Sequence, residues 1–171
     1  MAFIDLARER YSVRKFSDRP VEQEKLDQIL EAALVAPSAK NDQAWRIYVA
    51  RSEEALAKLN GLSRCIFGAP VVLVIGYDTT EEWHNPLEEG IHSGDQDASI
   101  VATHAMLEAW ELGVGSIWVN LFPNTQTARE LGLPETFVPV CLMPMGYAAE
   151  DAAPSPRHEA HRPIDELVSY L

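Results

Sequence analysis

The sequence predicts a fold in which helices cover the faces of a β-sheet, and two observations lead to that expectation. Helical patterns alternate with short runs of β-branched residues along the whole chain, which is typical of layered folds. The 171 residues, 47% of them hydrophobic and 23% charged, fit one globular domain over residues 1–171. The pattern alone does not decide whether the strands run parallel.

Six segments carry helical patterns, and most have a recognisable start or end. Apolar residues line one face of residues 22–35, which proline bounds on both sides. Ser52 and Asn124 are placed to cap the helices that follow them, because their side chains can accept an unpaired helical N–H. Gly113 ends a long helix in the left-handed conformation, and Pro163 opens the last one. The predicted helices are residues 3–7, 22–35, 52–62, 97–112, 124–131 and 163–170.

Four short segments rich in β-branched or aromatic residues predict strands. Residues 71–76 are apolar without alternation, so we expect them at the centre of the sheet, buried on both faces. Two stretches are irregular: residues 77–94 read as an acidic, mobile surface excursion, and residues 148–162 as a polar wrapping arm. The predicted strands are residues 46–50, 71–76, 115–119 and 138–143.

The charge and the cysteines narrow the classes of partner and location. A net charge of −12 repels polyanions, so neither nucleic acid nor an anionic membrane is expected as a partner. No apolar run reaches the ~20 residues of a membrane span, and Cys65 and Cys141 lack a second ligand at metal or redox spacing. Low cysteine use predicts a cytoplasmic protein. Five of the 14 basic residues nevertheless fall in the first 19 positions, which indicates a local anion site.

Two segments have side chains suited to a phosphorylated ligand. In the first, Arg10, Ser12 and Arg14 alternate, so an extended backbone would aim two guanidinium forks and a hydroxyl to one side. A solvated basic helix end explains the same residues without a ligand. In the second, the loop of residues 36–43 carries amide and hydroxyl groups before Trp45, which suit a heterocycle and its sugar alcohol chain. Such loops are also common where nothing binds.

Four sequence elements follow one another in a characteristic order. They are RYSVR at residues 10–14, APSAKNDQAW at 36–45, an aspartate-led helix ending in LGVGS at 97–116, and GY, an arm and RPIDELV at 146–168. Together they resemble the FMN-dependent nitroreductase family, whose second element has proline where Ala44 stands. The resemblance covers nearly the whole chain.

The resemblance implies an α+β fold with a mixed sheet, in an intertwined homodimer that holds FMN between its subunits. It places Arg10 and Ser12 on the flavin phosphate, and Arg14 at the N1/O2 edge of the ring, where a cation stabilises the charge of reduced flavin. The loop would come from the partner subunit. The cofactor-binding residues that it implies are Arg10, Tyr11, Ser12, Arg14, Pro37, Ser38, Ala39, Asn41, Gln43, Val114, Gly115, Ser116, His161 and Arg162.

The phosphate clamp contains one departure from the family. Many relatives place arginine two residues before the proline of the last helix, where this chain has His161. Arg157 and Arg162 are close enough to replace it, so the sequence leaves open which of the three completes the clamp. His158 and His161 lack the further ligands of a metal site, and no metal is expected.

The activity that the resemblance implies is transfer of a hydride from NADH or NADPH, through flavin N5, to a small flat electrophile such as a nitroaromatic or a quinone. Trp83, His84 and Trp118 are expected at the rim of the substrate pocket because aromatic rings stack on flat molecules, although ordinary core or surface aromatics explain them equally well. A flavin storage, carrier or sensor protein without turnover would use the same binding residues. The family also includes specialised flavoenzymes. The sequence does not fix the substrate, the nicotinamide preference, or whether residues 77–94 form a lid.

Overall fold

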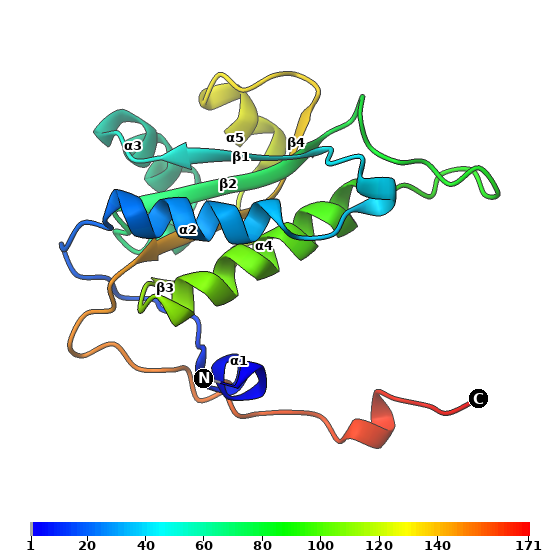
Figure 1. The fold of residues 1–171 in the computed structure, drawn as a ribbon. Coiled ribbons are helices and arrows are strands. Elements are labelled where there is room, and N and C mark those ends of the chain that lie inside the picture. The colour runs from blue at the N-terminus through cyan, green and yellow to red at the C-terminus, as the bar shows by residue number, and fades with distance from the viewer. Residues whose placement is uncertain (1) are drawn as a thin grey trace.

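A computed structural model describes residues 2–171 and shows a four-stranded sheet with helices on both faces (Figure 1). The strands are β1 (Trp45–Ala50), β2 (Val71–Asp78), β3 (Gly115–Ser116) and β4 (Phe137–Gly146), in the order β1-β2-β4-β3. All three pairs of neighbouring strands are antiparallel. An isolated parallel bridge between Ser12 and Ser116 joins the N-terminal segment to the sheet edge. The α+β class implied by the resemblance is therefore confirmed.

The helices pack on the sheet through two hydrophobic clusters. On one face, Val71, Leu73 and Ile75 of β2 contact α2 (Gln23–Leu34) and α4 (Gly94–Glu111). On the other face, Val72 and Val74 contact residues of α3 (Glu53–Leu62) and α5 (Asn124–Glu130). Strand β2 is thus buried on both sides, as its unbroken apolar pattern predicts.

The segment before the sheet and the arm after it run side by side. Helix α1 (Phe3–Glu9) leads into an extended segment in which Phe16 bridges Ala148. The amide of Ala149 donates to the carbonyl of Lys15 at 3.0 Å, and Lys15 also pairs with Asp151. The arm therefore follows the start of the chain below the sheet before it extends toward the C-terminus (Figure 1).

Three of the predicted boundaries between elements are wrong. Tyr77 and Asp78 belong to β2, and α4 already begins at Gly94, so the irregular excursion is limited to residues 79–93. The strand expected over residues 115–119 is regular only at Gly115–Ser116, and Val119 meets Leu142 through an isolated bridge.

The last two predicted helices also need correction. Asn124 is the first residue of α5 rather than its cap, because its side-chain amide donates to the carbonyl of Pro139 at 2.6 Å. The helix expected from Pro163 is a single 3-10 turn at Ile164–Glu166, in a stretch whose side chains are exposed. An isolated short helix without a buried face is unstable, which explains the shortening. Among residues 2–171 we find no helix with both the length and the apolar character to cross a membrane.

Candidate functional site

A small polar pocket lies where the segment after α1 meets the C-terminal arm. Its volume is about 270 Å³, and it is lined by Arg10, Tyr11, Ser12 and Arg14 from the segment after α1, and by Ser155, Arg157 and His158 from the arm. The structure thus brings together four of the residues predicted for the cofactor. It adds Ser155 and His158, which the sequence did not indicate, and Arg157, which was one of three candidates for the clamp.

The backbone after α1 explains why Ser12 and Arg14, on either side of Val13, face this pocket. Helix α1 ends at Glu9, and the backbone of the next residue, Arg10, is already extended (φ −59°, ψ 128°). Val13 is fully buried, and its amide donates to the carbonyl of Ser116 at 3.0 Å. Because successive side chains of an extended segment point to opposite sides, burial of Val13 turns Ser12 and Arg14 toward the pocket.

The pocket concentrates positive charge that the protein itself does not neutralise. Within residues 2–171, none of Arg10, Arg14 and Arg157 forms an ion pair with a carboxylate. Arg10 is partly buried, and this desolvation lowers the pKa of its guanidinium. A cation that loses water without gaining a counter-charge is costly, so the site is complementary to an anion.

His158 fixes the arm against the rest of the pocket. Its Nε2 atom lies 3.1 Å from the carbonyl oxygen of Arg8, and since a carbonyl can only accept, Nε2 donates. The imidazole also contacts the edge of Tyr11, which packs in turn on Trp110 of α4 with ring centroids 5.1 Å apart. The arm is thereby held at the C-terminal end of α4.

The two other candidates for the clamp lie outside this pocket. His161 and Arg162 are exposed, and Arg162 donates to the carboxylate of Glu166 at 2.8 Å. Their spacing to Pro163 suggested them for the clamp, and that spacing assumes a regular helix that starts at Pro163. The chain forms only a single 3-10 turn there.

Val114, Gly115 and Ser116 lie beside the pocket, next to the segment that carries Ser12. All three are buried. A Cβ atom added to Gly115 would come within 2.5 Å of the side chain of Val13, so this crossing requires glycine.

The loop of residues 36–43 lies at the other end of α4. It holds Pro37, Ser38, Ala39, Asn41 and Gln43, and the amide of Ala39 donates to Asp97 near the start of the helix. Tyr11 of the pocket packs on Trp110 near the end of that helix. These contacts are about 20 Å apart at the ~1.5 Å rise per residue of an α-helix. The loop and the pocket of one chain are therefore widely separated.

The three aromatic residues predicted for a substrate rim lie on two different segments of the chain. Trp83 and His84 lie on the excursion before α4, where the carboxylate of Glu82 binds Nδ1 of His92 at 2.6 Å and lies 4.0 Å from Nε2 of His84. Trp118 follows β3 and donates to the side chain of Asn120 at 2.6 Å.

Residues 2–171 contain no cluster of three or more histidine, cysteine or acidic side chains placed to hold a metal ion.

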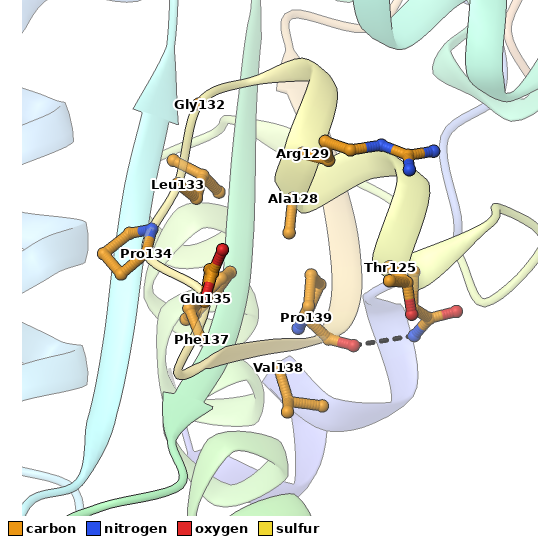
Figure 2. A pocket seen from close by; sticks show the side chains of 11 residues that line it. Thr125, Ala128, Arg129, Gly132, Leu133, Pro134, Glu135, Phe137, Val138 and Pro139 are labelled. Atoms are coloured by element: carbon orange, nitrogen blue, oxygen red, sulfur yellow. Dashed lines mark hydrogen bonds between the residues drawn. The ribbon is translucent and has the colours of Figure 1, made fainter.

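A second, more apolar pocket of about 520 Å³ lies between α5 and the start of β4 (Figure 2). The side-chain amide of Asn124, one of its polar lining groups, donates to the carbonyl of Pro139, and this contact is drawn as a dashed line. None of the residues predicted from the sequence lines it, and Arg129 is its one cation. The chemistry of an anionic cofactor therefore points to the polar pocket.

Comparisons with known proteins agree with one another. The model of a family described as the nitroreductase family matches residues 7–67 and 60–147. The chain is similar to a nitroreductase family protein of Clostridium difficile, a solved structure with 37% identity and a TM-score of 0.92, over 99% of this chain and 98% of that one. An FMN-dependent nitroreductase of the same species is 31% identical with a TM-score of 0.74, over 93% of this chain and 98% of that one. The FMN reductase (NAD(P)H) of Bacillus subtilis is 31% identical over 94% of this chain and 74% of its own length.

Proposed function

The chain belongs to the nitroreductase family, and from this premise we propose that it binds FMN and passes electrons from NADH or NADPH to a flat electrophile such as a nitroaromatic or a quinone. Its relatives include an FMN reductase (NAD(P)H) and an FMN-dependent nitroreductase, so the chain is an NAD(P)H-dependent flavin oxidoreductase. The chemical class of the electron acceptor is the more specific part of the proposal.

The observation that carries the proposal is the partly buried guanidinium of Arg10, which forms no ion pair within residues 2–171 of a protein whose net charge is −12. Ser12, Arg14 and Arg157 line the same small pocket. Guanidinium forks and hydroxyls are the donors that phosphate oxygens accept, so this donor set fits the phosphate of FMN.

Each group has a distinct task in the proposal. Arg10, Ser12 and Arg157 would hold the phosphate, while the cationic Arg14 would meet the N1/O2 edge of the ring and favour its anionic reduced form. Val114, Gly115 and Ser116 supply buried backbone beside the ring or its chain. FMN itself supplies the acceptance and donation of a hydride, so the protein contributes binding, orientation and electrostatics rather than a nucleophile.

An intertwined homodimer is part of the proposal because one chain cannot bring its loop to its own pocket. A second copy would offer the loop of residues 36–43 to the pocket of the first. The apolar side chains of Ile164, Leu167 and Tyr170 are 72%, 59% and 97% exposed, which suits an arm that packs on another chain. Sedimentation equilibrium tests this point, and a monomer at micromolar concentration would contradict it.

Two broader expectations also stay within the proposal. Residues 1–171 are taken as a single FMN-binding domain because both hydrophobic clusters pack on one sheet. A cytoplasmic location is supported by two free cysteines, Cys65 and Cys141.

The decisive experiment is anaerobic mixing of the yellow FMN-loaded protein with NADH or NADPH. We expect rapid bleaching of the visible flavin band and recovery when a quinone or nitroaromatic is added. Stable colour would instead support a storage, carrier or sensor protein. Steady-state rates should then give parallel double-reciprocal lines, as an alternating reaction requires, whereas intersecting lines would count against it.

A further inference from the structure

Asp97 is a buried carboxylate that no part of the proposed reaction uses. It lies in the first turn of α4 and is 3% exposed. No lysine, arginine or histidine of residues 2–171 forms an ion pair with it. Its charge is instead met by hydrogen bonds and by the positive end of the helix dipole.

The first of these hydrogen bonds reaches the candidate flavin loop. The amide of Ala39 donates to Oδ1 of Asp97 at 2.9 Å. Just after Ala39 the backbone enters the left-handed region at Lys40 (φ 51°), Asn41 (φ 61°) and Gln43 (φ 54°). Such conformations are uncommon for residues other than glycine and persist where the surroundings hold them.

Most of the hydrogen bonds that shape this loop are internal to it. The amide of Asn41 donates to the carbonyl of Ser38 at 3.0 Å, and the amide of Gln43 donates to the hydroxyl of Ser38 at 3.2 Å. These bonds fix the form of the loop but not its place. The bond from Ala39 to Asp97 ties its middle to α4.

The second hydrogen bond reaches the excursion that carries Trp83. The hydroxyl of Ser93 donates to Oδ2 of Asp97 at 2.8 Å, and the amide of Ser93 donates to the carbonyl of Trp83 at 3.0 Å. One carboxylate therefore joins the loop predicted to meet the flavin and the segment predicted to meet the substrate.

We propose that Asp97 is a positioning residue that sets the loop of residues 38–41 for contact with the isoalloxazine ring and ribityl chain, and couples that loop to the excursion. The inference rests on the proposed flavin function. Because the amide and hydroxyl groups of this loop suit a heterocycle and a sugar alcohol chain, and the loop carries no arginine, Asp97 acts on the ring and sugar parts of the ligand. Loss of the Asp97 carboxylate should therefore lower the affinities for riboflavin and for FMN by the same factor.

The test compares the affinities of FMN and riboflavin, from quenching of flavin fluorescence, for Asp97→Asn and Asp95→Asn. Asp95 is exposed in the same helical turn, so its substitution makes the same change of charge without breaking these bonds. We expect Asp97→Asn to raise both Kd values about tenfold, because the neutral amide oxygen is a weaker acceptor for the Ala39 amide than the carboxylate is, and Asp95→Asn to leave both unchanged. Hydrogen exchange of the peptide over residues 36–43 should become faster in Asp97→Asn alone.

If Asp97→Asn does not fold, Ala39→Pro removes the donor and keeps the carboxylate. Ser38 is already extended (φ −135°, ψ 162°), which a following proline requires. If either variant bound both flavins as tightly as the unaltered protein and showed unchanged hydrogen exchange over residues 36–43, the inference would be overturned. The proposed function would still stand. Failure of the unaltered protein to bind any flavin would overturn the proposed function and this inference with it.

Discussion

The imidazole Nε2 of His158 lies 3.1 Å from the carbonyl oxygen of Arg8, which joins two residues 150 positions apart in the sequence. This contact brings Arg157 to the pocket that Arg10 and Ser12 line. The arm is thus part of the candidate phosphate site rather than a loose tail.

Arg157 and Arg162 should differ sharply in their effect on FMN binding. Replacing Arg157 by alanine removes a cation of the pocket and should raise the Kd for FMN by about 10- to 100-fold, since a hydrogen bond to a charged group contributes about 1.5–3 kcal/mol. Riboflavin, which lacks the phosphate, should bind as before. Arg162→Ala is the matched control because Arg162 pairs with Glu166 outside the pocket. Calorimetric titration measures the FMN and riboflavin affinities of both variants. A loss of FMN affinity confined to Arg162→Ala would refute the assignment.

Gly76 and Gly61 should respond in opposite directions to substitution by alanine. At Gly76, where the pairing of β2 with β4 shifts register, a Cβ atom would lie 2.0 Å from the carbonyl oxygen of Val138. Backbone cannot yield cheaply, so Gly76→Ala should lower the free energy of unfolding by about 3 kcal/mol. Gly61 lies in α3 with no atom near that position, so Gly61→Ala should raise it by about 0.5–1 kcal/mol. Urea denaturation at neutral pH measures both changes, and equal values for the two variants would contradict the contact at Gly76.

The stability of the protein should fall in acid partly through Glu22. Hydrogen bonds from the hydroxyl of Tyr147 and the guanidinium of Arg19 lower the pKa of Glu22 to about 2, against 4.5 for a free glutamate. Because the folded pKa is the lower one, this contribution is complete above pH 4.5 and is lost as the pH falls toward 2.

Glu22→Gln should therefore lose less stability than the unaltered protein between pH 5 and about pH 2.5. Glu24→Gln is the control, since Glu24 lies two residues further on, in the first turn of α2, and is exposed. Urea unfolding at a series of pH values provides the comparison. Parallel pH profiles for the unaltered protein and Glu22→Gln would show that this carboxylate plays no part in acid unfolding.

The two cysteines should react with thiol reagents at different rates. Burial raises the pKa of the Cys141 thiol to about 12, and the thiolate is the reactive form. At pH 8 the folded protein should therefore release chromophore from an aromatic disulfide reagent in one phase, from the partly exposed Cys65. The second thiol should appear only on unfolding in urea. Equal rates in Cys65→Ser and Cys141→Ser would contradict the burial of Cys141.

Features set by neighbouring residues could be predicted from the sequence. The alternation of Arg10, Ser12 and Arg14 placed their side chains on one side because strand geometry is local. The hydroxyl of Ser52 accepts the amide of Ala55 at 3.2 Å, as the cap prediction requires. Gly113 takes the left-handed conformation (φ 74°) expected after a helix.

Features set by distant residues could not be predicted. Asn124 has the chemistry of a cap, but the carbonyl of Pro139, far along the chain, binds its amide. His158 and Ser155 enter the pocket through the course of an irregular arm, for which no periodicity exists. The excursion begins later than its composition predicts because Tyr77, although it precedes Asp78, is buried in β2.

The polar pocket also bears on how the holoprotein is made. Its two walls come from residues 10–14 and 155–158, so no cradle exists on a nascent polypeptide until the second wall has left the ribosome. A flavin would then bind only after the strands of the sheet, all of which precede residue 155, have been synthesised.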